Sequence, residues 1–460
     1  MSNKTALIAM AISLAYPAAS AMAEGPMSIE QSGNNNSTSI EQISAVNVGA
    51  ATMQRGVSNG VISILQGNSS AASTNSNATI NQLNSSNVLS VTQQTGDMNS
   101  AKIDQNNVAG STTVNGSFTT FSENRTGYNY YYWYGYGYYS RTSSGVDGPY
   151  IQGSQTHSSF ANVMQNGILN NASIMQSNSS NITSLINQNG ANNLASTSQN
   201  NISGGVTNSV AHTGSNSYSY WTGGNYYYNW YNYYYGYEYV NRTNNSYAFN
   251  QTSNPAATSI MQSGHNNNGM INQNSGSNVS AHIDQAGTAN VANIEQMNVS
   301  GSVQGNANDL TSSSSMISSS AAVGQSGTNN IGHIYQSNGV NVVASLIQSG
   351  TGNMGTITQN SGNQLFGAIA QSGDSNNAML TQSFGNNSAT ASQNGSFNEA
   401  NITQIGTGNQ ATITQIGMSN AASIAQYGAN NMASINQNGG NLHAAILQSG
   451  NKNVISITQR

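Results

Sequence analysis

Acidic side chains recur in the first two thirds of the chain, each one residue ahead of a glutamine in a repeated pattern. They are Glu30, Glu41, Asp104, Asp284 and Glu295. Two carboxylates held close together support glycoside hydrolysis, and a cluster of them binds a hard cation. Here they occur singly, no base accompanies them, and later repeats have Thr or Ala at the same place. We therefore interpret them as solvated charges that slow lateral aggregation.

The other residue types that do chemistry show no arrangement for it. The chain has no cysteine, so disulfides and thiolate metal sites are excluded. No glycine-rich phosphate loop opens a helix, and no aspartate recurs as calcium-binding solenoid repeats require. The six histidines lack metal-ligand spacing; they are His157, His212, His265, His282, His333 and His443. We expect no enzyme activity, no cofactor and no metal site.

Composition alone is typical of a disordered or prion-like chain. Only 5% of the 460 residues are charged, the formal net charge is −5, and Asn, Ser, Gly and Gln are abundant. Such a chain has no electrostatic footprint for nucleic acid or for an acidic membrane. A strict internal period, however, overrides the prediction of disorder.

The stretch from Ile402 to Arg460 follows an 11-residue cycle, Asn-x-Ala-x-Ile-x-Gln-x-Gly-x-x. Its glutamines are Gln404, Gln415, Gln426, Gln437, Gln448 and Gln459, and the isoleucines two residues earlier are Ile402, Ile413, Ile424, Ile435, Ile446 and Ile457. The asparagines are Asn398, Asn409, Asn420, Asn431 and Asn453, and the glycines are Gly406, Gly417, Gly428, Gly439 and Gly450. Specified residues at every second place predict a strand with one buried face.

The isoleucines and the glutamines share that buried face, so the amides need partners inside. Stacked identical rungs supply them, because each amide donates to one neighbouring rung and accepts from the other. Glycine tolerates the positive φ of a tight arc and is expected to end the strand there. Neither of the two facing sheets can bury itself alone, so the rungs must stack. We predict an all-β fold, a stacked strand-arc-strand β-solenoid of cross-β type with about 22 to 23 residues per rung and two Tyr-rich insertions.

Earlier blocks repeat the cycle less regularly, at spacings of 11 or 12. Their glutamines are Gln31, Gln42, Gln54, Gln66, Gln82, Gln93 and Gln105, then Gln165, Gln176, Gln188 and Gln199, then Gln262, Gln273, Gln285 and Gln296, and finally Gln325, Gln336, Gln348, Gln359, Gln371, Gln382 and Gln393. Val91 takes the apolar place before Gln93, whereas Thr52 departs from it. Each spacing of 12 must be absorbed in an arc or a bulge, and the alternation of 11 and 12 indicates that one side of the stack has the longer connection. The 28 glutamines predict 14 rungs and a rod of about 65 to 70 Å, whose open strand edges are templates for another chain.

Two interruptions of the ladder hold 21 of the 24 tyrosines and all three tryptophans. Dense aromatic side chains suit surface or glycan binding, fibril bundling or oxidative cross-linking; the alternative is a pair of tolerated low-complexity loops. The Tyr/Gly alternation allows hairpins without requiring them. Candidate contact residues are Tyr130, Tyr131, Tyr132, Trp133, Tyr226, Tyr227, Tyr228 and Trp230.

The N-terminal segment has the three parts of a secretory signal peptide, with cleavage expected between Ala23 and Glu24. After this segment, 1–23, we expect repeats of the 11-residue unit at 24–106, a Tyr-rich insertion at 107–160, repeats at 161–200, a second insertion at 201–258, repeats at 259–297, a Ser-rich interruption at 298–322 and regular repeats at 323–460.

The unit, taken twice per rung and preceded by a signal peptide, resembles the curlin repeat of curli subunits, which form a functional amyloid of Gram-negative biofilms. The resemblance implies a secreted homopolymer that crosses the outer membrane unfolded through a dedicated pore, with periplasmic chaperones. It also implies growth on a surface-bound nucleator subunit into a cell-surface fibre for adhesion to host or abiotic surfaces and for biofilm matrix. This chain has more rungs than the usual curli subunit, and its Tyr-rich insertions have no counterpart there.

Two other classes remain open from the residues alone. One is a monomeric β-solenoid adhesin that binds ice, a glycan or another surface through its Tyr-rich inserts. It would be a capped, soluble rod that does not seed itself. The other is a β-helix enzyme acting on polysaccharide, which would need clustered acids or bases in a groove.

Overall fold

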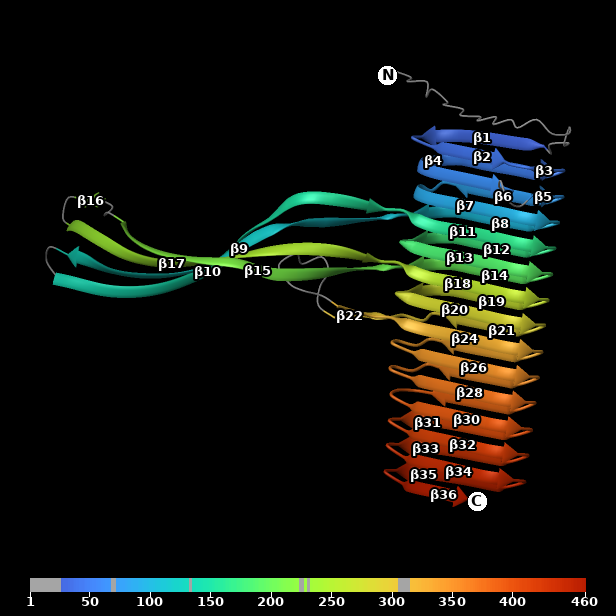
Figure 1. Ribbon diagram of the computed structural model, residues 1–460. Coiled ribbons are helices and arrows are strands. Elements are labelled where there is room, and N and C mark those ends of the chain that lie inside the picture. Colours follow the sequence, from blue (N-terminus) through green and yellow to red (C-terminus); the bar gives the residue numbers. More distant parts are fainter. Residues whose placement is uncertain (1–25, 68–71, 132–134, 223–226, 230–231, 305–314) are drawn as a thin grey trace.

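The computed structural model describes residues 26–67, 72–131, 135–222, 227–229, 232–304 and 315–460. These residues form strands, turns and bends and no helix. No membrane-spanning helix is found in the part of the chain that the structure describes. The fold is a solenoid of stacked parallel strands from which a long antiparallel arm projects to one side (Figure 1). The predicted all-β solenoid is thereby confirmed.

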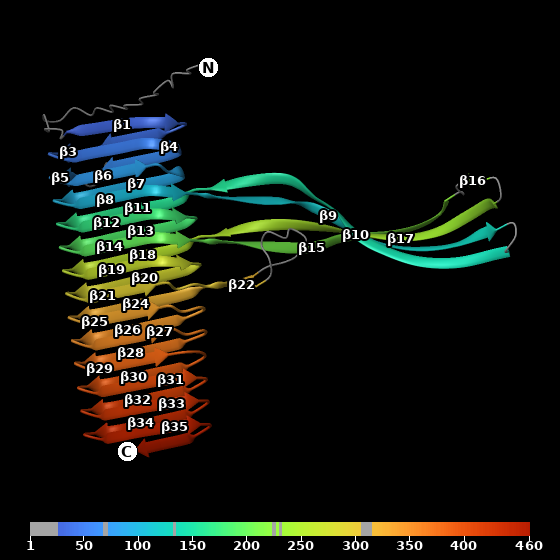
Figure 2. The same ribbon diagram turned by 180° about the vertical axis from the view of Figure 1, so that it is seen from behind.

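The solenoid has two faces, and each face is one ladder of parallel strands. Within the described residues, the first ladder runs β1 (Met27–Asn34), β4 (Gly49–Gln66), β6 (Asn77–Leu83), β8 (Ser100–Ala109), β12 (Asn171–Ser180), β14 (Leu194–Ser203), β19 (Asn268–Ser277), β21 (Val291–Met297), β25 (Ile331–Ser337), β27 (Met354–Asn360), β29 (Asn377–Ser383), β31 (Glu399–Thr407), β33 (Ala421–Ala429) and β35 (His443–Asn451). Consecutive regular strands of the chain alternate between the two faces, so one turn of the solenoid contributes one strand to each (Figure 2).

The second ladder begins with β2 and uses the second half of the long strand β4 as its next level. It runs β2 (Ser37–Gln42), β4, β7 (Ser86–Asp97), β11 (Ser159–Ile168), β13 (Ile182–Ala191), β18 (Ala256–His265), β20 (Val279–Thr288), β24 (Ser319–Thr328), β26 (Val343–Thr351), β28 (Phe366–Asp374), β30 (Ser388–Ser396), β32 (Gln410–Met418), β34 (Met432–Gly440) and β36 (Val454–Gln459). Two short strands, β3 (Ala45–Val46) and β5 (Ser73–Thr74), pair beside the first levels.

The core between the faces contains small and branched apolar side chains from every second position. In β32 the inward residues Ala411, Ile413 and Gln415 are buried while their neighbours face solvent or are half-buried. The same alanine and isoleucine places, repeated level by level, join into one continuous apolar cluster along the solenoid. Each level buries little by itself, so the stability of the fold comes from stacking.

The two edges of the solenoid, where the chain crosses between faces, have different cores. On one edge a column of apolar side chains fills the arc in the earlier levels, from Val57 to Leu365. Here the arcs are long: the chain leaves β25 at Ser337 and enters β26 at Val343. On the other edge the arcs are short and carry buried asparagines. From Gln54 onward, the spacings of 12 thus belong to the apolar edge.

The arcs turn two residues later than the sequence pattern indicated. Gly406 has a φ of +124°, but it is still part of β31 and pairs with Gly428 of the next level. The turn itself lies at Gly408 and Asn409, after β31 ends at Thr407. The glycine therefore bends a strand that stays hydrogen-bonded, and it does not end that strand.

One ladder glutamine predicted from the sequence was wrong. Gln94, not Gln93, aligns with Gln66 on one side and Gln165 on the other. Gln93 lies on the outer face, and so does Val91, the residue chosen as its apolar partner. Thr92 occupies the inward place instead and is buried. The long apolar-edge arc before β7 adds one residue, which moves the inward set by one position.

The two Tyr-rich inserts form a single antiparallel sheet in the order β10-β9-β17-β15. Its strands are β9 (Ser111–Tyr131), β10 (Gly135–His157), β15 (Gly205–Thr222) and β17 (Asn232–Asn254), with the short β16 (Tyr227–Asn229) paired to β17. Each insert is a long hairpin, and β9 pairs with β17 to join the two. A third, small hairpin of β22 (Ser302–Gln304) and β23 (Ser315–Ile317) leaves the same edge of the solenoid (Figure 1).

Candidate assembly interface: amide columns and open strand edges

Two columns of glutamine side chains run through the core of the solenoid, one behind each face. In both columns the Nε2 atom of one glutamine donates to Oε1 of the glutamine one level further along the chain, at 2.7 to 3.0 Å. The first column is Gln31, Gln54, Gln82, Gln105, Gln176, Gln199, Gln273, Gln296, Gln336, Gln359, Gln382, Gln404, Gln426 and Gln448. The second is Gln42, Gln66, Gln94, Gln165, Gln188, Gln262, Gln285, Gln325, Gln348, Gln371, Gln393, Gln415, Gln437 and Gln459.

A second hydrogen bond fixes which way most of these amides point. Gln404 Nε2 also donates to the backbone carbonyl of Ser388, on the opposite face, at 3.0 Å. The reversed amide would direct its oxygen at that carbonyl oxygen, and neither atom has a proton to donate. The same cross-core bond occurs at Gln415, which donates to the carbonyl of Glu399 at 2.8 Å. Both columns are therefore polar, with all their donors pointing along the chain toward higher residue numbers.

Buried asparagines form further columns at the arcs. Asn398 Nδ2 donates to Oδ1 of Asn376 at 3.0 Å and to the carbonyl of Gly417 at 2.9 Å. On this short-arc edge the places are Asn99, Asn170, Asn193, Asn267, Asn290, Asn330, Asn353, Asn376, Asn398 and Asn420. On the other edge asparagine replaces the apolar residues only from Asn387 onward, followed by Asn409, Asn431 and Asn453.

The two glutamine columns end differently at the two ends of the described solenoid. At the first level, Gln42 Oε1 is buried and has no hydrogen-bond partner among the described residues. At the last level, Gln459 Nε2 donates to the carbonyl of His443 but has no further level to donate to within the described chain. Among the residues that the structure describes, the strands of these levels are paired on one side only: β1 and β2 with β4, β35 with β33 and β36 with β34. One end thus offers amide acceptors, the other offers donors, and both offer open backbone edges.

The structure places the residues singled out from the sequence as follows. The thirteen glutamines from Gln325 to Gln459 alternate between the two columns, and the five asparagines lie at the arcs of both edges. Ile402, Ile413, Ile424, Ile435 and Ile446 are buried and Ile457, in the last strand, packs against them. Gly406, Gly417, Gly428, Gly439 and Gly450 all have positive φ.

The aromatic candidates are only partly within the described residues. The backbones of Tyr130 and Tyr131 belong to β9, and those of Tyr227 and Tyr228 to β16. Tyr132, Trp133, Tyr226 and Trp230 lie outside the described residues, as do Ala23 and Glu24 of the expected cleavage site.

Sequence reasoning missed the asparagines before Asn398 on the short-arc edge. Their signal was a fixed place five residues after the second-column glutamine, as Asn353 follows Gln348.

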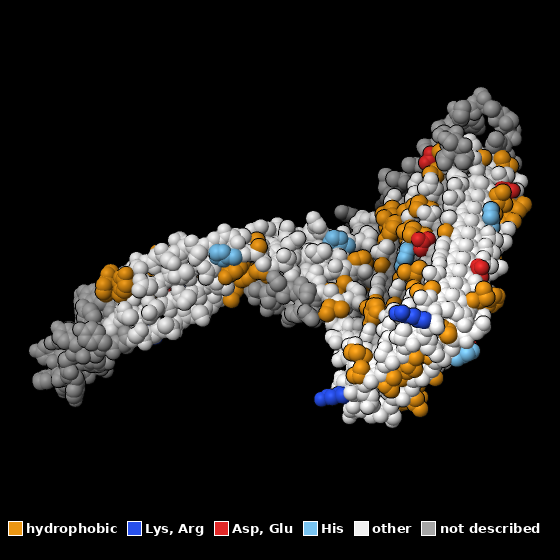
Figure 3. All heavy atoms as spheres, turned by 60° about the horizontal axis from the view of Figure 1, so that its bottom comes forward, with side chains coloured by type: hydrophobic (Ala, Val, Ile, Leu, Met, Phe, Trp, Pro, Cys, Tyr) orange, Lys and Arg blue, Asp and Glu red, His pale blue; other side chains and the backbone are white. Residues whose placement is uncertain are grey.

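Charged side chains are few and scattered on the outside of the solenoid (Figure 3). Glu30 accepts a hydrogen bond from Arg55 at 2.5 Å, and Asp104 pairs with Lys102 at 2.7 Å. The hydrogen bond and the charge of Glu30 raise the pKa of the Arg55 guanidinium. Within the described residues, no three His, Asp or Glu side chains gather in a way that could hold a metal ion. These acids contribute surface charge and short ion pairs.

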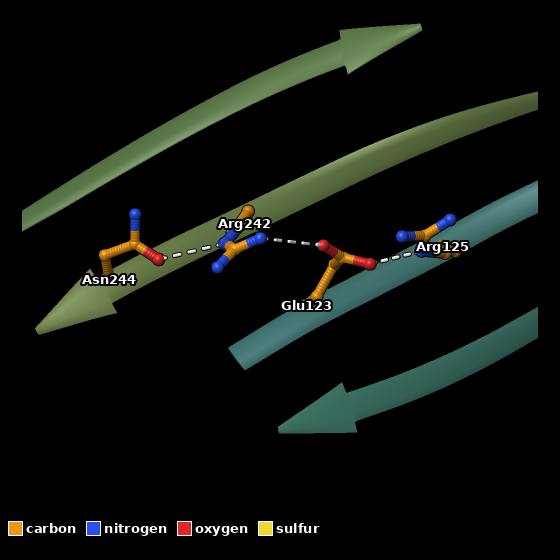
Figure 4. A network of polar contacts seen from close by, with 4 residues as sticks. All are labelled: Glu123, Arg125, Arg242 and Asn244. Carbon is orange, nitrogen blue, oxygen red and sulfur yellow. Dashed lines mark hydrogen bonds and ion pairs between the residues drawn. The ribbon is translucent and has the colours of Figure 1, made fainter. Parts of the chain in front are cut away.

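The seam between the two hairpins of the arm contains a buried carboxylate. Glu123 of β9 is 3% exposed and forms ion pairs with Arg125 on its own strand and with Arg242 of β17, the latter at 3.7 Å (Figure 4). Arg242 also donates to Asn244 and lies over the ring of Phe121, 4.4 Å from its centroid. A buried charge is tolerated only when it is paired, so this contact ties the second insert to the first.

Aromatic contacts extend the same seam and the outer strand beside it. Phe118 of β9 stacks on Tyr247 of β17 with centroids 4.9 Å apart. On β10 the Tyr150 hydroxyl donates to Asp147 at 2.6 Å, and this hydrogen bond, with the carboxylate charge, raises the pKa of the phenol. The arm is thus a defined sheet with its own packed contacts.

Comparison with known families identifies the repeat of the solenoid. The family model of the curlin associated repeat matches residues 373–406, 398–428 and 428–460. The matched region includes strands β29 to β36, where the amide columns and the glycine bends are most regular. No curated protein matches the chain. Residues 373–460 are therefore similar to the curlin associated repeat.

Proposed function

We propose that this chain is a secreted subunit that self-assembles into extracellular, curli-like amyloid fibres for adhesion and biofilm matrix. One observation carries the proposal: both glutamine columns reach the terminal levels of the described solenoid, where the strand edges are open. An open strand edge with unpaired backbone groups is a template for another strand. The curlin-associated repeats at the C-terminal end support the same function.

Chain-to-chain contact follows from the polarity of the columns. Gln448 ends the first column and Gln459 ends the second, while Gln31 and Gln42 begin them. If a second copy stacks head to tail, its Gln31 and Gln42 accept hydrogen bonds from these donors. The unsatisfied Oε1 of Gln42 then gains the partner it lacks within the described residues. Burying a polar atom without a partner costs about 1 to 3 kcal/mol, so this contact favours stacking in one orientation.

Export and growth would follow the route that the family resemblance implies. The signal-like segment before Glu24 directs the chain to the periplasm. A periplasmic chaperone keeps it unfolded, an outer-membrane pore secretes it, and a surface-bound nucleator subunit starts the fibre. The absence of cysteine agrees with passage as an unfolded chain, because no disulfide must form before secretion.

Seeded growth tests the proposal. The mature chain from Glu24 onward, freed of denaturant, is expected to form thioflavin T-positive fibres after a lag. Sonicated fibres of the same chain, added at about one-twentieth of the chain by mass, are expected to abolish this lag, because they present ready-made strand edges. Seeds of an unrelated amyloid serve as the control and should leave the lag unchanged. A chain that stays soluble and β-rich for days with its own seeds would contradict the proposal.

The alternative is a monomeric β-solenoid adhesin, and the arm is the observation that favours it. A long sheet that leaves the solenoid sideways places aromatic side chains such as Trp221, which is 64% exposed, away from the stacking ends. An adhesin of this kind would bind a glycan or another surface as a soluble rod. The seeding experiment separates the two functions, because the adhesin predicts no self-templated growth.

A further inference from the structure

The arm has two outer strands, β10 and β15, and the described residues pair each of them on one side only. Open edges of this length usually contain features that prevent another strand from pairing. The two edges differ in this respect. The difference identifies which edge is available to a partner.

The β10 edge is blunted. It contains Arg141, Asp147 and Pro149, and its register with β9 shifts twice, between Asp147 and Tyr150 and between Ile151 and Gly153. Charges, proline and bulges are the devices by which edge strands avoid further pairing. This strand therefore does not fit an incoming strand along its length.

The distal half of β15, Gly214–Thr222, has none of these devices. It contains no charged residue and no proline, and its register with β17 is continuous from Gly214 to Thr222. The half nearer the solenoid is different, because the side chains of Met316 of β23 and of Asn278 already lie against Gly205 at its start. The open edge is therefore confined to Gly214–Thr222, far from the solenoid.

The side chains of this half are held in place but remain accessible. Ser215 and Ser219 donate hydrogen bonds to Asn245 and Asn241 of β17, at 2.7 and 2.5 Å. Tyr218 lies beside Tyr220 with ring centroids 5.9 Å apart and is 43% exposed. A strand that is already ordered loses little conformational entropy when it pairs again.

We propose that the distal half of β15 pairs antiparallel with the same segment of a second copy of this chain. An antiparallel strand pair has a two-fold axis, so one surface is enough to form it. The arm itself shows that its strands pair in this way, because β9 and β17 come from separate inserts and join edge to edge from Tyr131 with Tyr234 to Asn115 with Asn250. Pairing β15 with its copy continues that sheet outward from four strands to eight.

The consequence for fibres rests on the proposed function. In a head-to-tail fibre the arm recurs once per chain, after 14 levels of about 4.8 Å, which is about 67 Å. A four-stranded arm is only about 19 Å wide at the same spacing, so successive arms of one straight fibre do not meet. Pairing through β15 therefore joins arms of different fibres, and the arm acts as a cross-bridge that bundles them.

Charge substitutions at the edge test the proposal. One variant has Asn216→Lys with Tyr218→Lys, and a second has Asn216→Glu with Tyr218→Glu. Like charges that face each other across paired strands repel, so each variant alone is expected to bundle about tenfold less, as measured by low-speed sedimentation and electron microscopy of preformed fibres. Mixing preformed fibres of the two variants is expected to restore bundling, because Lys then faces Glu. The matched control is Thr142→Lys with Ser144→Lys on β10, which should bundle as the unsubstituted chain does.

Seeded growth is measured on all variants and is expected to be unchanged, because the ends of the solenoid are untouched. Bundling that persists in both single-charge variants, or that the mixture fails to restore, would overturn the cross-bridge while leaving the fibre proposal intact. If no variant forms fibres, the same charges are tested on the soluble chain by sedimentation velocity. A concentration-dependent dimer that each charge pair abolishes and the mixture restores supports the pairing, and a monomer throughout refutes it.

Discussion

Replacing Gly406 with alanine is expected to cause a large local loss of stability. A Cβ at this position would lie 1.9 Å from the carbonyl oxygen of Gly428 in the next level. The φ of +124° is also a conformation that alanine rarely adopts. Backbone strain of this kind costs about 1 to 3 kcal/mol, and the clash with a fixed backbone atom adds to it, so we expect about 3 kcal/mol or more for Gly406→Ala. Hydrogen exchange of the backbone amides in β31 and β33 measures the loss.

Gly324→Ala is the matched control. Gly324 belongs to the same solenoid, but nothing lies within 4 Å of a Cβ added there. Alanine is the better strand residue of the two, so this change is expected to alter stability by less than about 1 kcal/mol. Equal amide protection in the two variants would mean that the glycine bend does not constrain stacking.

Replacing Gln404 with glutamate is expected to break the first glutamine column at neutral pH. Gln404 is fully buried, donates to Gln426 and to the carbonyl of Ser388, and accepts from Gln382. A carboxylate keeps the acceptor but loses both donors, and it buries an unpaired charge. We expect Gln404→Glu to cost about 3 to 5 kcal/mol at pH 7, measured as the shift in the urea midpoint of the soluble chain.

The cost should depend on pH in a defined direction. Burial disfavours the charged form, so the folded chain raises the pKa of the introduced carboxyl above its ordinary value of about 4.3. The variant is then most stable below that ordinary value and loses stability as the pH rises through the folded pKa. Gln410→Glu, on the exposed side of β32, is the control and should show no such dependence. If the two variants unfold at the same urea concentration at pH 7, the buried amide column contributes nothing to stability.

The regular part of the solenoid could be predicted because four residue types keep phase with the strand. Ala411, Ile413 and Gln415 occupy alternate places, and only a strand with one buried face explains that spacing. The alternation of 11 and 12 also indicated one edge with longer arcs. The structure shows the physical cause of the longer arcs. On that edge a column of apolar side chains, which includes Val342 and Leu365, takes the place of asparagines.

Other features could not be predicted because their cause is not local. Gln93 and Gln94 are adjacent, and hydrophobicity favoured Val91 over Thr92 as the inward residue. Gln94 takes the inward place because it stacks between Gln66 and Gln165. That alignment depends on the length of the preceding arc, which lies outside the strand itself. The pairing of β9 with β17 likewise depends on two inserts leaving the same edge of the solenoid. The inserts contain no periodic pattern that would predict this pairing. Nothing in the sequence around Glu123 indicates that Arg242 is its partner.

High-resolution electron cryomicroscopy of fibres grown from the mature chain tests the central claim most directly. We predict parallel rungs that continue from one chain into the next at about 4.8 Å without a break. At the junction, β36 of one chain should pair with β2 of the next, and Gln459 should donate to Gln42. A fibre in which chains meet through their arms or their outer faces, with the edges of β1, β2, β35 and β36 left open, would contradict the account.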